Sequence, residues 1–144
     1  KKSNLTLDLV GGGEEEQNLQ TYAQDNNIAC NFLGRFPNEE LPKIISKYQL
    51  FALTSKSEGN PKALLETMSC GLCPIGTNVP GIRDIINKDN GFLAEANQED
   101  YSNALTTASQ DKELVNQKSI NARKYIEENC SLTSLIETEL ALYP

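Results

Sequence analysis

The sequence predicts an α/β fold, with a Rossmann-like parallel sheet that carries helices on both faces. Short apolar runs alternate with helical patterns along most of the 144 residues. Strands and helices that alternate in this way form βαβ units, in which the strands are parallel and the crossovers are right-handed. The run Leu50–Thr54 is a continuous apolar strand, which is typical of a parallel sheet covered on both faces. A chain of this length is expected to form a single domain, residues 1–144.

Each element of the first half is predicted from local spacing. After a strand-like start that glycines end, apolar residues at positions 19, 22 and 23 recur with the spacing of one helix face. Asn38 is a plausible N-cap for the next helix. The predicted elements are, in order, strand Leu5–Val10, helix Glu14–Asn26, strand Ile28–Leu33, helix Asn38–Tyr48 and strand Leu50–Thr54.

The second half is predicted in the same way and ends in helices. Pro61 stands near the first helical position, where its fixed φ favours a helix start. From Gln98 onward every pattern is helical. The predicted elements are helix Pro61–Ser69, strand Cys73–Thr77, a brief helix Gly81–Ile86, strand Gly91–Ala94, and helices over Gln98–Gln110, Asp111–Asn129 and Leu132–Leu142.

The composition excludes several classes of function. A formal net charge of -7 argues against nucleic-acid binding and against contact with an anionic membrane, because both need a basic surface. No apolar run approaches the roughly 20 residues that a membrane-spanning helix needs. The chain has no histidine, so nucleophile systems based on histidine and most zinc sites are excluded. Any catalysis must depend on carboxylates, backbone amides, Lys or Arg.

The four cysteines are too few for a disulfide-stapled secreted scaffold, so the cytoplasm is the expected compartment. Cys70 and Cys73 match the C-x-x-C pattern. A redox pair would begin a helix, where the helix dipole lowers the thiol pKa, but Cys70 ends one here. No second pair is present to complete a zinc site. Both thiols are interpreted as small buried residues, with a redox role left as an alternative.

The candidate site lies in the loops that follow the strands, because ligands of open parallel sheets bind beyond the carboxyl ends of the strands. The loop Gly11–Glu14 resembles part of a dinucleotide fingerprint, but the acids that follow its glycines would repel a pyrophosphate. A structural turn is the favoured interpretation there. The glycines, Gly12 among them, still allow a ligand to approach the backbone.

The loop Ser55–Pro61 follows the most apolar strand and is the stronger candidate. Gly59 permits an unusual backbone conformation, and the amides from Lys62 onward are expected to point toward the crevice. Glu58 lies at the mouth of this loop. Glu66 lies about one and a half turns into the helix, among apolar neighbours where an acid needs a partner or a ligand. On spacing alone, two acids on a solvated helix remain an open alternative.

Several blocks of the sequence follow a known pattern in the right order. The chain follows most positions of the pattern E-G-x-P-x-x-x-L-E-A-M-A-x-G-x-P-V-I from Glu58, but its Ala-rich stretch reads Thr67-Met-Ser-Cys, and it follows G-x-x-E-I-I from Gly81. The blocks V-G-x-G-x-E, F-L-G-x and N-G-x-L match the stretches that begin at Val10, Asn31 and Asn90. Together they resemble the donor-binding domain of retaining GT-B glycosyltransferases, the glycosyl transferases group 1 family. The resemblance covers nearly the whole chain and implies the C-terminal half of a GT-B architecture.

The resemblance implies a role for each matching residue. Glu66 would accept hydrogen bonds from the ribose hydroxyls of a nucleotide-sugar. Glu58, the implied catalytic residue, would bind hydroxyls of the transferred sugar or support developing oxocarbenium charge. No metal or other cofactor is implied, and the chain has no D-x-D motif. Asn60, Pro61, Lys62 and Ala63 would approach the sugar and diphosphate largely through their backbone, and Arg35 and Phe36 would border the base.

The chain also departs from the family pattern. Asp84 stands where the pattern has Glu. Family members carry an earlier βα unit, whose Arg and Lys neutralise the leaving diphosphate, and an N-terminal acceptor domain. Neither has a counterpart here, so residues 1–144 are interpreted as a fragment of the donor half that is inactive alone. Its partner would be a nucleotide-sugar, and a glycan or lipid-linked acceptor would bind the missing domain. The full-length enzyme would be cytoplasmic, or peripheral on the inner face of the membrane.

Two other functions remain open at this point. One is a nucleotide-sugar epimerase with the same architecture, which would release an epimerised product from the full-length protein. The other is a non-catalytic, Rossmann-like interaction module, which would bind no nucleotide. The sequence identifies neither the base nor the sugar, the acceptor or the linkage.

Overall fold

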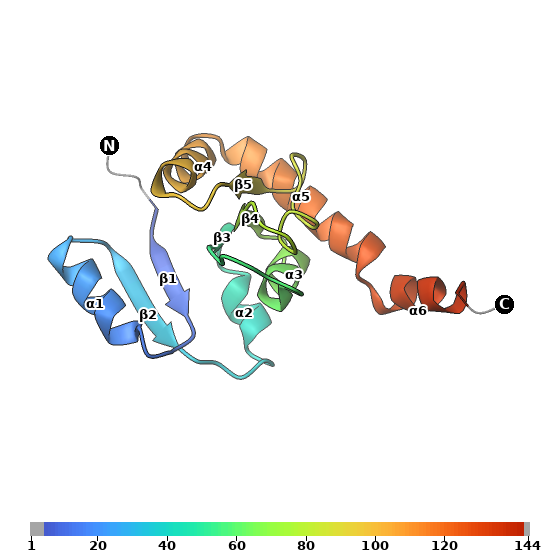
Figure 1. Ribbon diagram of the computed structural model, residues 1–144, viewed down its shortest axis with the longest axis horizontal. Coiled ribbons are helices and arrows are strands. Elements are labelled where there is room, and N and C mark those ends of the chain that lie inside the picture. Colours follow the sequence, from blue (N-terminus) through green and yellow to red (C-terminus); the bar gives the residue numbers. More distant parts are fainter. Residues whose placement is uncertain (1–4, 143–144) are drawn as a thin grey trace. The chain divides into compact units, whose positions relative to one another are not determined.

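The computed structural model describes residues 5–142, which form two compact units. The first unit ends at Leu41, and the second begins at Pro42. All strand pairs in the described part of the chain are parallel, as the sequence predicts. Figure 1 shows the elements of each unit along the chain.

The first unit is a small βαβ motif, made of β1 (Leu7–Val10), α1 (Glu16–Asp25) and β2 (Cys30–Gly34). The two strands pair from Leu7 opposite Cys30, and their register shifts between Leu9 and Val10. At the shifted end Gly34 takes a positive φ of 71°. Such a bulge turns the chain sharply as it leaves the sheet.

The second unit is built on the three-stranded parallel sheet β3–β4–β5. Its strands pair from Leu50 opposite Cys73 and from Ile75 opposite Phe92. The short helix α2 (Leu41–Ile45) stands at the boundary between the units. The other elements are β3 (Leu50–Leu53), α3 (Lys62–Ser69), β4 (Cys73–Thr77), β5 (Phe92–Ala94), α4 (Gln98–Gln110), α5 (Lys112–Asn129) and α6 (Leu132–Leu140).

The core of the second unit lies on both faces of the central strand β4, whose five residues are all buried. On one face Cys73 and Ile75 pack with Ala108 and Val115 of the helices α4 and α5. The opposite face carries a second cluster, which consists of Leu64, Met68, Ile82, Ile86 and Ala122. The expectation of a parallel sheet with helices on both faces is therefore confirmed.

Helix α5 contributes to both clusters, because Val115 near its start packs on one face and Ala122 in its second half packs on the other. It runs along the second unit from α4 toward α6 (Figure 1). Lys118 lies between these positions with its side chain buried. Its ammonium donates to the Lys88 carbonyl and lies 4.8 Å from the centre of the Phe92 ring. The charge is therefore buried with partners, as burial of a charge requires.

The segment from Gly81 to Ile86 differs from the prediction, because it forms turns instead of a helix. Each backbone hydrogen bond in this segment closes one turn of the chain. An example is the bond from the Ile86 backbone amide to the Ile82 carbonyl (2.9 Å). Gly81 begins with a φ of 85°, outside the helical region. At the other end, the buried side chain of Asn90 donates to the Ile85 carbonyl (2.9 Å) and replaces a helical partner.

We predict that Gly76→Ala destabilises the second unit by about 1–3 kcal/mol, because its methyl group overpacks the core. A Cβ at position 76 would lie 2.5 Å from Ile82 Cγ2 and 2.7 Å from Ile86 Cδ1. Urea unfolding followed by circular dichroism measures the loss. Gly59→Ala is the matched control, since a Cβ there meets nothing within 4 Å. Equal stability of the two variants would contradict close packing against β4.

Candidate functional site

The carboxyl ends of β3, β4 and β5 meet at one edge of the sheet, because the three strands are parallel. The loops that leave this edge contact one another through side chains. Asn78, just after β4, donates to the Glu95 carboxylate just after β5 (2.7 Å). The backbone amide of Asn78 also donates to the Ala94 carbonyl (2.8 Å). The edge is thus a connected surface, at the position where open parallel sheets bind ligands.

A second group of hydrogen bonds fixes the end of β3. The Tyr101 hydroxyl of α4 donates to the Leu53 carbonyl (2.8 Å) and lies 2.7 Å from Thr77 Oγ1. Thr77 Oγ1 also donates to the Leu53 carbonyl (3.3 Å). Burial raises the pKa of Tyr101, and the hydrogen bond to Thr77 offsets this only in part. The hydroxyl therefore keeps its proton and remains a donor.

Glu58 lies half-buried in the loop that this anchored end of β3 leads into. Its Oε1 accepts a hydrogen bond from Ser55 Oγ at 2.6 Å. Its backbone packs against Gly81 of the next loop so closely that a Cβ on Gly81 would lie 2.3 Å from the Glu58 carbonyl oxygen. Asp84 in turn accepts the Gly81 amide (2.9 Å), so aspartate at this position serves as a local cap. Glu58 is therefore held at both its side chain and its backbone.

Helix α3 starts directly after this loop, with the buried Pro61 as its N-cap residue. The expectation of free amides from Lys62 onward holds only in part. The Lys62 amide donates to the Asn60 carbonyl (2.9 Å), and the Leu64 amide donates to the Pro61 carbonyl (2.9 Å). Among the described residues, no hydrogen bond engages the amide of Ala63 between them. The helix start thus leaves one amide for an anion or a hydroxyl.

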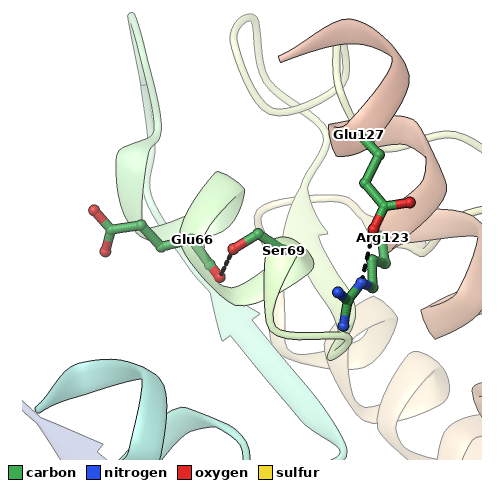
Figure 2. Close-up of polar contacts among 4 residues, drawn as sticks. All are labelled: Glu66, Ser69, Arg123 and Glu127. Atoms are coloured by element: carbon green, nitrogen blue, oxygen red, sulfur yellow. Dashed lines mark hydrogen bonds and ion pairs between the residues drawn. The ribbon is translucent and has the colours of Figure 1, made fainter. Parts of the chain in front are cut away.

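Glu66 lies on the exposed side of α3 together with Lys62, Ala63 and Ser69. This differs from the apolar surroundings expected from its sequence neighbours, because Leu64, Thr67 and Met68 turn toward the core instead. Figure 2 shows the Glu66 carboxylate pointing away from α5, while its backbone carbonyl accepts Ser69 Oγ (2.7 Å).

The Glu66 carboxylate is not paired with the nearby helix α5, from which it points away (Figure 2). The Arg123 side chain of α5 is held by Glu127 at 2.9 Å (Figure 2). Within residues 5–142, no hydrogen bond or ion pair of the structure reaches the Glu66 carboxylate. The group needs no structural partner, since it is exposed, and it is open to a ligand.

The remaining predicted site residues belong to the first unit. Arg35 reaches back across the shifted end of the sheet and donates to the Gly12 carbonyl (2.8 Å). A Cβ at Gly12 would meet Glu16 Oε2 at 3.3 Å and Arg35 Nε at 3.6 Å. Phe36 follows, half-buried. The loops after β1 and β2 are therefore in contact, as expected at the carboxyl ends of parallel strands.

Three residues that complete the arrangement around Glu58 were not singled out from the sequence: Ser55, Gly81 and Tyr101. Ser55 and Glu58 have the spacing S-x-x-E, which is visible in the sequence, and here the serine hydroxyl donates to the glutamate side chain. Gly81 carried only the ambiguous signal of a Pro-Gly turn. Tyr101 lies 48 positions from its partner Leu53, and no local pattern reports such a contact.

Cys70 and Cys73 lie at positions where they serve the structure of the fold. Cys70 is the C-cap residue of α3, and Cys73 is fully buried at the start of β4. Burial raises the pKa of the Cys73 thiol to about 12, and the charge of Lys118 offsets this only in part. A thiol in this state is a poor nucleophile, so the structure disfavours the redox alternative.

Within residues 5–142, no three side chains of His, Cys, Asp or Glu lie together in a way that could hold a metal ion. Independence from metal stays a prediction, because substrate phosphates can themselves contribute metal ligands. In the same described range, no helix is both long enough and apolar enough to cross a bilayer.

The chain is similar to known proteins in sequence and in fold. The family described as Glycosyl transferases group 1 matches residues 1–125. An uncharacterized glycosyltransferase of Haemophilus influenzae is 31% identical over 142 residues, which are 95% of this chain and 39% of that protein. The UDP-Gal:alpha-D-GlcNAc-diphosphoundecaprenol alpha-1,3-galactosyltransferase of Escherichia coli is 33% identical over 138 residues, 94% of this chain and 35% of that protein.

A solved structure has the same fold. The sucrose-phosphate synthase of Thermosynechococcus elongatus superposes with a TM-score of 0.86 at 22% identity, over 96% of this chain and 37% of that one. The chain therefore spans well under half the length of each of these three proteins.

We predict that Cys73 resists alkylation at pH 8 in the folded chain. With a pKa of about 12, only about one Cys73 thiol in ten thousand is ionised at that pH. Iodoacetamide labelling followed by peptide mass spectrometry measures the modification, with the half-buried Cys70 as the internal comparison. Modification of Cys73 at the rate of Cys70, without unfolding, would support a redox pair instead.

We predict that Gly81→Ala destabilises the chain by about 2–4 kcal/mol, through a strained positive φ and a clash with the Glu58 carbonyl. Gly71→Ala is the matched control, because Gly71 has a φ of 82° but a Cβ there meets nothing within 4 Å. The difference in urea midpoint between the two variants isolates the clash. No difference would show that the two loops are not in firm contact.

Proposed function

The chain belongs to the glycosyl transferases group 1 family, and we propose from this that it binds the nucleotide-sugar donor of a retaining glycosyltransferase. One observation carries the proposal: Glu58 and Glu66 flank the start of α3 at the carboxyl end of β3. Glu58 is held by Ser55, and the Glu66 carboxylate lies exposed on the helix.

The proposed roles follow from the chemistry of each group. The free carboxylate of Glu66 accepts hydrogen bonds from two vicinal ribose hydroxyls, which match its two oxygens. The amide of Ala63 and the exposed side chain of Lys62, at the positive end of the helix dipole, contact the diphosphate. Asn60 and Pro61 place the loop backbone beside the sugar. By resemblance to the family, Arg35 and Phe36 are proposed to border the base, and Gly12 to allow a ligand close to the backbone.

Glu58 is the proposed catalytic residue. During transfer the bond between the anomeric carbon and the diphosphate breaks and a bond to the acceptor oxygen forms, while positive charge develops on the sugar ring. The nucleoside diphosphate leaves and takes up the proton that the acceptor hydroxyl loses. A carboxylate held beside the ring stabilises that charge without having to reorganise. Glu58 is suited to this because its side chain and its carbonyl are both fixed. No step requires a metal ion.

The donor and acceptor are proposed from the relatives. The printed name of the Escherichia coli relative gives UDP-Gal as its donor and a sugar on diphosphoundecaprenol as its acceptor. A UDP-sugar is accordingly the first donor to test, with a glycan or lipid-linked acceptor. Since the chain spans 35% of that relative, the acceptor site is proposed to lie in a further domain of the full-length enzyme. The enzyme would work in the cytoplasm, with no nucleic-acid partner and no membrane contact through these residues.

We predict that one nucleoside diphosphate and its sugar conjugates raise the melting temperature of the protein, and that Glu66→Ala weakens this binding about 10- to 100-fold. The loss reflects hydrogen bonds to a charged group, worth about 1.5–3 kcal/mol. A thermal-shift screen with UDP, GDP, ADP and their sugar conjugates, followed by titration calorimetry, measures it. Glu113→Ala is the matched control, an exposed glutamate on α5.

Each outcome of the screen is informative. Binding that is lost in Glu66→Ala and kept in Glu113→Ala supports the donor site and identifies the base. Absence of binding to the full-length protein would favour the non-catalytic interaction module. Incubation of the full-length protein with the bound nucleotide-sugar then separates the two enzyme classes, because an epimerase converts the donor sugar to its epimer without any acceptor.

A further inference from the structure

The two site carboxylates differ in how the protein holds them. Glu58 Oε1 accepts a hydrogen bond from the Ser55 hydroxyl at 2.6 Å, whereas no side chain of the described residues forms a hydrogen bond or ion pair with the Glu66 carboxylate. A hydrogen bond to a carboxylate is among the stronger interactions of a neutral donor and fixes the plane of the acceptor. One oxygen of Glu58 is thus engaged, and its Oε2 has no bonded partner in residues 5–142.

We propose that Ser55 is a positioning residue for donor-sugar recognition, which holds Glu58 Oε1 so that Oε2 faces the hydroxyls of the transferred sugar. The inference rests on the donor-binding function proposed above. It assigns to Ser55 the orientation of the Glu58 carboxylate and no contact of its own with substrate.

The backbone around this hydrogen bond is rigid at both ends, so the hydroxyl acts from a fixed position. Before Ser55, the Leu53 carbonyl accepts both Tyr101 and Thr77. After it, the Glu58 carbonyl lies against Gly81, which leaves no space for the loop to shift in that direction. The Ser55–Glu58 hydrogen bond therefore orients the side chain within a loop whose backbone is already placed.

The same loop provides an internal comparison. Ser57 is exposed, and its side chain makes no hydrogen bond to any residue from 5 to 142, whereas Ser55 is half-buried and bonded to Glu58. Truncation of either serine removes the same atoms from the same loop. A general effect of loop truncation would therefore appear at both positions, while loss of orientation would appear only at Ser55.

The test measures how much the sugar adds to nucleotide affinity, as the ratio of the dissociation constant of the nucleotide to that of its sugar conjugate. The probes are UDP with UDP-glucose, UDP-galactose and UDP-N-acetylglucosamine, and GDP with GDP-mannose. The full-length protein is titrated by calorimetry as wild type and as Ser55→Ala, Ser55→Thr and Ser57→Ala. Ser55→Val accompanies Ser55→Thr, because the two side chains share a shape and differ in the hydroxyl.

In Ser55→Ala we expect the ratio of the two dissociation constants to fall about three- to tenfold, because a misplaced carboxylate binds the sugar less well. The affinity for the nucleotide alone should be unchanged. Ser55→Thr should restore the ratio, and Ser57→Ala should match wild type. Comparison of Ser55→Thr with Ser55→Val gives the same test if Ser55→Ala fails to fold.

Three different results would overturn the inference. If wild type binds a nucleotide-sugar more tightly than its nucleotide and the hydroxyl-free variants keep that difference, Ser55 has no positioning role and the proposed function stands. Equal weakening of nucleotide and nucleotide-sugar leads to the same conclusion. If wild type binds none of the probes, the proposed function itself fails, and the role of Ser55 fails with it.

Discussion

Burial of β4 on both faces is the constraint on which the second unit depends. All five of its residues are inaccessible to solvent, so helices must cover both sides of the strand. Gly76 has no side chain, and Ile82 and Ile86 fill that space. This pulls the segment after β4 down onto the sheet, and Gly81 at its start is brought against the Glu58 backbone. The geometry of the candidate site is therefore a consequence of core packing one strand away.

The fold was largely predictable because its signals are local. The predicted bounds of β4 and the approximate bounds predicted for α4 agree with the structure, since β4 begins after a Gly-Leu turn and α4 has the N-cap Asn97. The prediction of a helix from Gly81 was wrong. The Ile residues have helical spacing, but the positive φ of Gly81 and the hydrogen bond of the buried Asn90 side chain override it. Apolar spacing reports which side chains are buried, and it does not report where the backbone must turn.

The candidate site was predictable in outline and not in its connections. Glu58 and the start of α3 follow from the order of motifs along the chain, and the structure places them at the carboxyl edge as expected. The exposure of Glu66 was not foreseen, because its neighbours in sequence are apolar and turn away from it in space. The hydrogen bond from the Tyr101 hydroxyl joins helix α4 to the end of β3, and such a contact depends on tertiary packing alone.

The unequal attachment of Glu58 and Glu66 has a consequence for how enzymes of this kind can diversify. On the exposed face of α3, the Glu66 carboxylate makes no hydrogen bond or ion pair within residues 5–142, so this position can vary without loss of such a partner. Ser55 and Gly81 hold Glu58 directly, and Tyr101 holds the end of β3 that leads to it. A change in the geometry of Glu58 therefore requires coordinated changes in several elements. Specificity that depends on the α3 face can therefore drift gradually, whereas specificity that depends on Glu58 is expected to change rarely and in concerted steps.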